Sequence, residues 1–147
     1  MLPTMRHHNP DAAAIAALLR GARTIAVVGL SGDPGRPSHG VARAMRAYGC
    51  RIVPVNPKLD AWQDQRAFPT LTAAVAAQPP GTPIDIVDVF RRPEHVAALV
   101  EECLQLRLPV LWLQLGVIDE AAAARAQAAG MMMVMDRCIL VERRALG

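Results

Sequence analysis

The hydrophobic positions of the chain form short apolar runs that are separated by helical patterns. The runs are rich in β-branched or other strand-compatible residues and fit buried strands at residues 24–30, 51–55, 84–90, 110–114 and 131–135. Between these runs, apolar side chains recur at the spacing of one helix face, as at Val41, Met45 and Tyr48. The pattern therefore predicts strands and helices that alternate along the chain.

Capping residues and glycines set the expected helix boundaries. Asp11 fits an N-cap and Gly21 a stop, which predicts an N-terminal helix at about 11–21. Further helices are expected at 38–48, 93–104 and 119–130, with short ones near 70–77 and within 136–146. His7 and His8 precede the first helix, in a tail that we expect to be solvated.

Five alternations of strand and helix require a parallel sheet with right-handed crossovers. We therefore predict a single α/β domain over residues 1–147, a Rossmann-like three-layer sandwich. Its five-stranded parallel sheet is expected to have the strand order 3-2-1-4-5. Residues 59–83 show the least regular pattern and are expected to form a surface return.

A glycine-rich turn follows the first strand. Gly29, Gly32 and Gly35 lie in a segment too rich in turn formers for a regular element, and a helix begins near Ser38. A strand, a glycine turn and a helix N-terminus form the usual anion cradle of α/β folds. With the predicted strand order, residues 29–32 and 114–116 form the two lips of one crevice, with residues 56–58 and 89–91 further along the same edge.

The end of the second strand indicates which ligand would fit. Domains that bind NAD usually carry an acid there, whereas this strand ends in Asn56, Pro57 and Lys58. A lysine can neutralise a phosphate on the ribose, and Arg36 and Arg91 add positive charge to the same edge. These residues predict a ligand with a pyrophosphate and an extra ribose phosphate, either coenzyme A or NADP.

Composition and charge narrow the class of protein. The 147 residues are 52% hydrophobic and only 3% aromatic, with a net charge of +3 and scattered basic residues, so a nucleic-acid partner is not expected. No apolar run is long enough for a membrane span, and the N-terminus lacks the apolar core of a signal peptide. Three cysteines without a shared motif fit reduced thiols in a cytoplasmic protein, the expected location.

Five motifs occur in order at the strand ends: AVVGLS with RPS, PVNP, DVFRR, W-x-Q-x-GV and MDRC. Together they resemble the small single-domain coenzyme A-binding proteins, which are similar to the nucleotide-binding domain of the succinyl-coenzyme A synthetase α subunit. The resemblance runs from about Thr24 to Glu142. It departs from the family pattern between Leu59 and Phe68, where a glycine is usual and Trp62-Gln63-Asp64 stands instead, so it says least about the outer wall of the adenosine site.

The resemblance implies a role for each group of candidate residues. Gly29, Leu30, Ser31 and Arg36 would hold the pyrophosphate, with Gly32 and Ser38 in the same turn and helix start. Asn56, Pro57 and Lys58 would flank the adenosine and its 3′-phosphate. Val89, Phe90 and Arg91 would line the adenine and ribose side, and Gln114 and Gly116 would lie toward the pantetheine.

No constellation of reactive residues is recognisable. Ser31 lies in a near match to G-x-S-x-G, but Asp33 replaces the last glycine. His39 lies close to the turn, Asp88 fits a paired structural carboxylate, and Cys138 a small buried residue. We therefore expect a protein that binds coenzyme A or an acyl-coenzyme A without turning it over and without a metal. The alternatives are an NADP-dependent oxidoreductase and a nucleotide-sensing regulatory module, and a protein partner is conceivable but unidentified.

Overall fold

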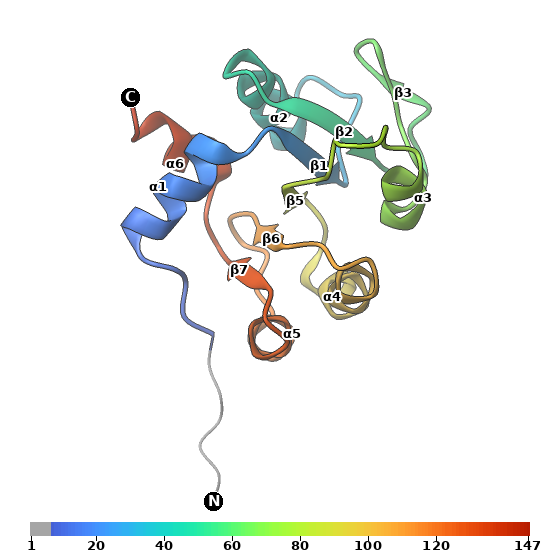
Figure 1. Ribbon diagram of the computed structural model, residues 1–147. Helices are drawn as coiled ribbons and strands as arrows, with labels where there is room; N and C mark the ends of the chain where they lie inside the picture. Colours follow the sequence, from blue (N-terminus) through green and yellow to red (C-terminus); the bar gives the residue numbers. More distant parts are fainter. Residues whose placement is uncertain (1–6) are drawn as a thin grey trace, which may run out of the picture.

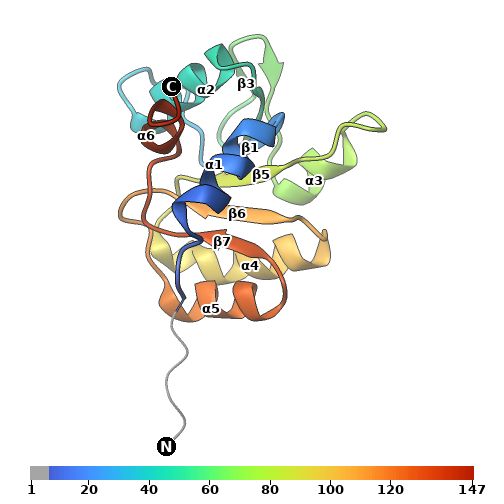
Figure 2. The same ribbon diagram turned by 60° about the vertical axis from the view of Figure 1, so that its left-hand side comes forward.

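The computed structural model describes residues 7–147, in which a parallel sheet carries helices on both faces (Figures 1 and 2). The helices are α1 (Ala12–Gly21), α2 (Pro37–Ala47), α3 (Leu71–Ala76), α4 (Val96–Gln105), α5 (Glu120–Ala128) and α6 (Ile139–Arg144). The strands are β1 (Thr24–Val28), β2 (Arg51–Val55), β3 (Ala61–Trp62), β4 (Gln65–Arg66), β5 (Ile86–Val89), β6 (Val110–Leu113) and β7 (Met132–Val134).

The main sheet has the order β2-β1-β5-β6-β7, and all its pairings are parallel. The predicted five-stranded parallel sheet is confirmed, but the predicted order 3-2-1-4-5 is wrong. The third long strand, β5, pairs with β1 and not with β2, so the order is 2-1-3-4-5. The chain therefore reverses its direction across the sheet between β1 and β5, and their carboxyl ends form the switch point at which ligands bind in such folds.

The outer edge of β2 explains why no third strand adds there. Pro54 lies within β2 and has no N–H to offer a neighbouring strand, which suits an edge strand. This edge is covered by the segment around Phe68, whose N–H donates to the Pro54 carbonyl at 2.9 Å and whose carbonyl accepts from the Asn56 N–H at 2.9 Å. The connection then crosses to the other side of β1 before the next strand begins.

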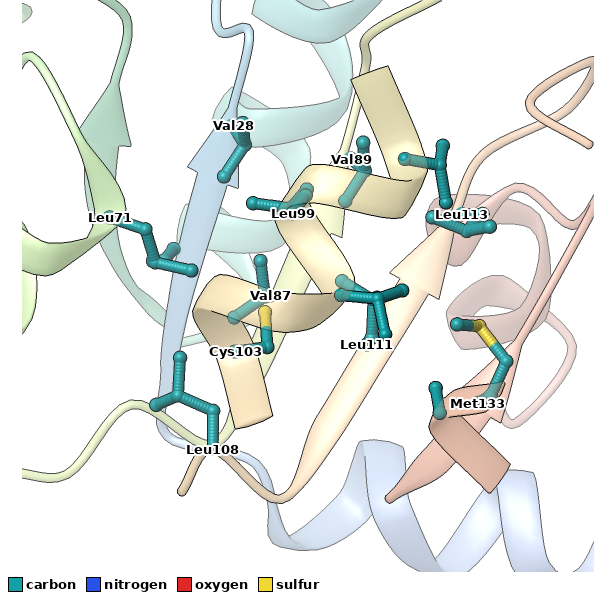
Figure 3. Close-up of a cluster of buried hydrophobic side chains, with 14 of the residues drawn as sticks. Val28, Leu71, Val87, Val89, Leu99, Cys103, Leu108, Leu111, Leu113 and Met133 are labelled. Atoms are coloured by element: carbon teal, nitrogen blue, oxygen red, sulfur yellow. The ribbon is translucent and has the colours of Figure 1, made fainter. Parts of the chain in front are cut away.

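Each face of the sheet has its own hydrophobic core. Side chains alternate along a strand, so Ala26 and Val28 face one layer while Ile25 and Val27 face the other. The first layer contains α3, α4 and α5, and Figure 3 shows Leu99 and Cys103 of α4 over the strand residues Val87 and Leu111. The second layer contains α1, α2 and α6. Within residues 7–147, no helix is long and apolar enough to cross a membrane.

The N-terminal segment is held more firmly than the sequence suggests. The side chain of Asp11 caps α1 by accepting from the Ala14 N–H, as predicted. His7, however, is buried, so the expectation of a solvated tail is wrong for this residue. Its ring contacts Gln127 Oε1 at 3.0 Å, and Asn9 bonds both the N–H and the carbonyl of Met135. The segment is tied to the far edge of the sheet by residues distant in sequence.

A two-stranded hairpin, β3–β4, lies where the sequence departs from the family pattern. Gln63 has a positive φ of 55° at its turn, and Asp64 pairs with Arg46 of α2 at 2.8 Å. Trp62 is buried against the α2 layer, and its indole N–H donates to His39 Nδ1 at 3.2 Å. The hairpin therefore packs beside α2.

Candidate functional site

The turn between β1 and α2 is held by its own side chains. Ser38 Oγ accepts from the Ser31 N–H at 3.0 Å, and Ser31 Oγ accepts from the Asp33 N–H at 3.0 Å. Arg36 is the N-cap residue of α2 and makes no side-chain capping hydrogen bond. Pro37 has no N–H and the His39 N–H donates to the Arg36 carbonyl at 3.1 Å, so an anion at this helix end would meet the N–H of Ser38.

Gly29 is required at the switch point by the protein itself. It has a φ of +87°, and a Cβ built on it would lie 2.3 Å from the Phe90 carbonyl oxygen of the next strand. The sequence suggested that this glycine lets the backbone approach a ligand. The structure adds a different reason: the carbonyl at the end of β5 leaves no room for any side chain at position 29.

A cavity of about 760 Å³ opens at the carboxyl edge of the sheet. It lies within the size range of ligand pockets. Its walls come from the first turn and α2, the loop after β5, the loop after β6 and the start of α6. The lining residues are Gly29, Ser31, Arg36, Pro37, Ser38, Val41, Phe90, Arg91, Arg92, Pro93, Gln114, Leu115, Gly116, Val117 and Cys138.

A second cavity of about 220 Å³ lies on the other side of Arg91. Its lining includes Val28, Val55 and Pro57, at the ends of β1 and β2, together with residues of α3 and α4. Arg91 lines both cavities, so their walls share this one cationic residue. The two cavities together follow the carboxyl ends of β2, β1, β5 and β6.

The edge carries positive charge without carboxylate partners. Within residues 7–147, no acidic group lies within 4.0 Å of the cationic groups of Arg36, Arg91 or Lys58. Arg36 and Lys58 are exposed and Arg91 is half-buried. Cations that stand free beside a cavity favour an anionic ligand over a neutral one.

Gln114 brings an oriented polar group into the larger cavity. It is only 4% exposed, and its Nε2 donates to Asp88 Oδ1 at 2.6 Å. Burial raises the pKa of Asp88 to about 7, against the opposing effect of the hydrogen bonds from Gln114 and from the backbone at Val89. Since Asp88 occupies the amide nitrogen, the amide oxygen of Gln114 is the group that is left for a ligand.

Asp136 positions the loop that follows β6. Its Oδ1 accepts from the Gly116 N–H at 2.8 Å, and Trp112 Nε1 donates to the neighbouring Arg137 carbonyl at 2.9 Å. In the sequence, Asp136 is part of the MDRC motif, which predicts no role for it. Its partner lies 20 residues away, so nothing in the local pattern could have identified it.

Most of the predicted site residues come together at this edge. Eight of them line the larger cavity: Gly29, Ser31, Arg36, Ser38, Phe90, Arg91, Gln114 and Gly116. Pro57 lines the smaller one. Sequence reasoning did not assign Val41, Pro93, Leu115 or Val117 to the site, because an apolar wall residue looks like any other apolar residue in a sequence.

The remaining predicted residues lie at the edge but outside the cavity walls. The side chains of Leu30 and Val89 are buried in the two cores, so only their backbones could meet a ligand. Asn56 holds the turns together, since its Nδ2 donates to the Leu30 carbonyl and its Oδ1 accepts from the Lys58 N–H. Gly32 lies beside Leu59, and the Lys58 side chain is exposed.

Among the residues that the structure describes, the Ser31 hydroxyl has no base in hydrogen-bond contact. The indole N–H of Trp62 can only donate, so His39 Nδ1 is its acceptor. The same nitrogen lies 3.1 Å from the Ser31 carbonyl oxygen, and no hydrogen bond joins the ring to the Ser31 hydroxyl within the described residues. The other nucleophile candidate, Cys138, is half-buried and lines the larger cavity.

Comparison with known proteins adds independent findings. A family model described as CoA binding domain matches residues 23–144. An uncharacterized protein of Bacillus subtilis (strain 168), YneT, is 41% identical over 133 residues, which is 90% of this chain and 94% of that protein. The structure of cell-free ID.343 from Thermus thermophilus is 36% identical with a TM-score of 0.82, covering 94% of this chain and all of the other. A hypothetical protein from Pyrococcus horikoshii OT3 is 28% identical with a TM-score of 0.84, and each chain is covered fully.

Proposed function

The chain belongs to the CoA binding domain family, and from this premise we propose that it binds coenzyme A or an acyl-coenzyme A along the two cavities without converting it. The observation that carries the proposal is that the walls of the two cavities share Arg91. A ligand with a nucleotide head, a central pyrophosphate and a long arm needs two pockets with a cation where they meet.

The ligand parts can be assigned to the edge residues. The smaller cavity, with Pro57 beside the exposed Lys58, takes the adenosine and its 3′-phosphate. The pyrophosphate lies between Arg91, Arg36 and the N-terminal end of α2. The pantetheine arm runs through the larger cavity past Gln114, whose amide oxygen accepts from one of its amide N–H groups.

The first test concerns the 3′-phosphate. Coenzyme A is expected to bind several-fold more tightly than dephospho-coenzyme A, because a partly exposed charge pair with Lys58 contributes on the order of 1 kcal/mol. Lys58→Ala should reduce the affinity for coenzyme A and leave that for the dephospho form almost unchanged. Added salt should shrink the preference. Calorimetric titration of both ligands measures each effect.

A matched control separates this contact from the general charge of the protein. Arg20 lies in the last turn of α1, which leads into the opposite edge of the sheet, so Arg20→Ala removes one positive charge away from the site. Arg20→Ala should change the affinities for coenzyme A and for dephospho-coenzyme A by the same small amount. Equal affinity of the unaltered protein for both ligands would remove the assignment of Lys58.

A second test concerns turnover. We expect no multiple-turnover release of thiol from acetyl-, succinyl- or long-chain acyl-coenzyme A, because the Ser31 hydroxyl has no base in hydrogen-bond contact within the described residues. We likewise expect no oxidation of NADPH with a panel of carbonyl compounds. Thiol release or absorbance loss above that of Ser31→Ala and Cys138→Ala variants would refute the proposal that the protein only binds its ligand.

A further inference from the structure

One buried ring nitrogen beside the glycine turn faces two partners with opposite requirements. His39 is 6% exposed, and its Nδ1 lies 3.2 Å from the indole nitrogen of Trp62 and 3.1 Å from the carbonyl oxygen of Ser31. The indole N–H can only donate and the carbonyl oxygen can only accept. Nδ1 must therefore be without a proton to bond Trp62 and must carry a proton to bond Ser31, so the ring satisfies one partner at a time.

Resting on the proposed function, we propose that His39 is a proton-coupled positioning residue for the turn between β1 and α2. In the free protein, the neutral ring accepts from the indole N–H of Trp62. When the pyrophosphate of coenzyme A lies at the turn, Nδ1 takes up a proton from the solvent. The resulting imidazolium donates from Nδ1 to the Ser31 carbonyl.

The Ser31 carbonyl depends on this ring for a donor. Within residues 7–147, no hydrogen bond from a backbone N–H reaches this oxygen. The Ser31 N–H and hydroxyl are already bonded, to Ser38 Oγ and to the Asp33 N–H. A proton on His39 Nδ1 completes the bonding of Ser31, which lines the larger cavity, and so fixes the turn around the anion.

The position of His39 explains why the ring stays neutral until an anion is bound. His39 is the third residue of α2, at the positive end of the helix dipole and three residues after Arg36. Both disfavour a charged ring. Charging it also leaves the N–H of Trp62, which is 1% exposed, without its acceptor. A pyrophosphate beside Ser31 brings the opposite charge and favours the imidazolium.

The protein supplies no carboxylate that would take the place of this anion. Within residues 7–147, no acidic oxygen lies within 4.0 Å of the His39 ring. The Asp33 carboxylate accepts from the Gly35 N–H, and Asp64 pairs with Arg46. The charged residues of the turn, of α2 and of the hairpin with the segment before it are Asp33, Arg36, Arg43, Arg46, Lys58, Asp60, Asp64 and Arg66.

The test observes the protonation of the His39 ring directly, by ring-nitrogen NMR of isotope-labelled full chain at pH 7.5. The His39 signals are assigned by their loss in His39→Gln, or by sequential assignment of the unaltered protein if that variant does not fold. The expected result is an Nδ1 without a proton in the free protein and with a proton in the complex with coenzyme A. Trp62→Phe removes the indole donor, so a neutral ring with its proton on Nδ1 can bond Ser31. In this variant Nδ1 should carry a proton before coenzyme A is added.

Calorimetric titration with coenzyme A between pH 6 and pH 8 gives a second readout. Because binding takes up a proton, the affinity should fall as the pH rises. It should fall more in the unaltered protein than in His39→Gln, by on the order of fivefold over this range, as for a charge at a helix end. Burial raises the pKa of Asp88 to about 7, but Asp88 and the ligand phosphates titrate in both proteins, so the comparison isolates His39.

A matched control and the possible outcomes make the test decisive. His8 is exposed and lines neither cavity, so His8→Gln removes an imidazole away from the site and should keep the pH profile of the unaltered protein. An Nδ1 with the same protonation in the free and bound protein, or a His39→Gln variant with the full pH dependence, would overturn the inference. If coenzyme A binds without a change at His39, the inference fails while the proposed function stands. If coenzyme A does not bind, both fail.

Discussion

Replacing Gly29 by alanine is expected to destabilise the protein by on the order of 3–5 kcal/mol, one of the largest effects of any single substitution at the site. Two costs combine at this position. The backbone has a φ of +87°, and the added Cβ would lie 2.3 Å from the Phe90 carbonyl oxygen. That oxygen cannot move freely, since Phe90 is joined to β1 through its N–H, which donates to the Val28 carbonyl at 2.8 Å.

Two other glycines separate these costs. Gly49 has a φ of +100°, but no atom lies within 4 Å of a Cβ built on it. Gly49→Ala should therefore lower the free energy of unfolding only through the strained backbone conformation, by about 1–2 kcal/mol. Gly40 lies within α2 with open space around it, so Gly40→Ala should stabilise the helix by about 0.5–1 kcal/mol. Denaturant unfolding of the three variants measures the differences.

The order of the three values is the result that matters. If Gly29→Ala cost no more than Gly49→Ala, the contact with Phe90 would not be a constraint, and the role of Gly29 would return to close approach of a ligand. A folded Gly29→Ala protein should also lose affinity for coenzyme A, because relief of the contact moves the β5 loop that carries Arg91.

The elements of the fold could be predicted from local patterns. Asp11 and Asp119 do cap their helices, since each side chain accepts from an N–H three residues on. The carboxyl ends of parallel strands share one edge, so the placement of Gly29, Arg91 and Gln114 together followed from the strand assignments alone. For the same reason, most of the candidate residues lie together at this edge although the predicted strand order was wrong.

The strand order could not be read in the same way. The sequence pattern shows that a strand is buried but not which strand it pairs with, and β5 is equally apolar beside β1 or β2. The one local signal was Pro54, which cannot donate to a further strand on its side of β2. This proline favours β2 as an edge strand, and an edge position of β2 is what the observed order has.

Polar contacts between distant residues were also beyond the sequence. The buried ring of His7 contacts the side chain of Gln127, which is 120 residues away in the sequence. Gln114 donates to Asp88, which is 26 residues away. The prediction that Asp88 is a paired carboxylate is confirmed, but no local pattern shows that its partner is Gln114 or that His7 has a partner. The hairpin turn at Gln63 has a positive φ without a glycine, so the usual signal for a tight turn was missing.

Asp88 carries the other large expected effect, a loss of stability as the pH rises. Its side chain is 1% exposed, and its strand neighbours in register are Val27 and Trp112. Because burial disfavours the carboxylate, the folded-state pKa is raised from 3.8 to about 7. Between these values the folded protein holds a proton that the unfolded chain has released. The stabilising contribution is thus complete below about pH 4 and is lost as the pH rises through 7.

Asp88→Asn should remove this dependence. The asparagine keeps an oxygen that accepts from Gln114 Nε2 but has no charge to bury. Relative to the unaltered protein, the variant should gain on the order of 2–4 kcal/mol in the free energy of unfolding at pH 8.5, and much less at pH 4.5. Asp60→Asn, at an exposed position, serves as the control and should show no such difference between the two pH values.

Denaturant unfolding at the two pH values decides the matter. If Asp88→Asn and the unaltered protein had the same free energy of unfolding at both pH values, the buried carboxylate would have to be stabilised by more than the hydrogen bonds from Gln114 and Val89. The same variant also tests the site, because Gln114 lines the cavity in the orientation that Asp88 gives it. Asp88→Leu removes the acceptor altogether and leaves the Gln114 amide free to turn. It should therefore weaken coenzyme A binding at every pH, whereas Asp88→Asn should preserve it.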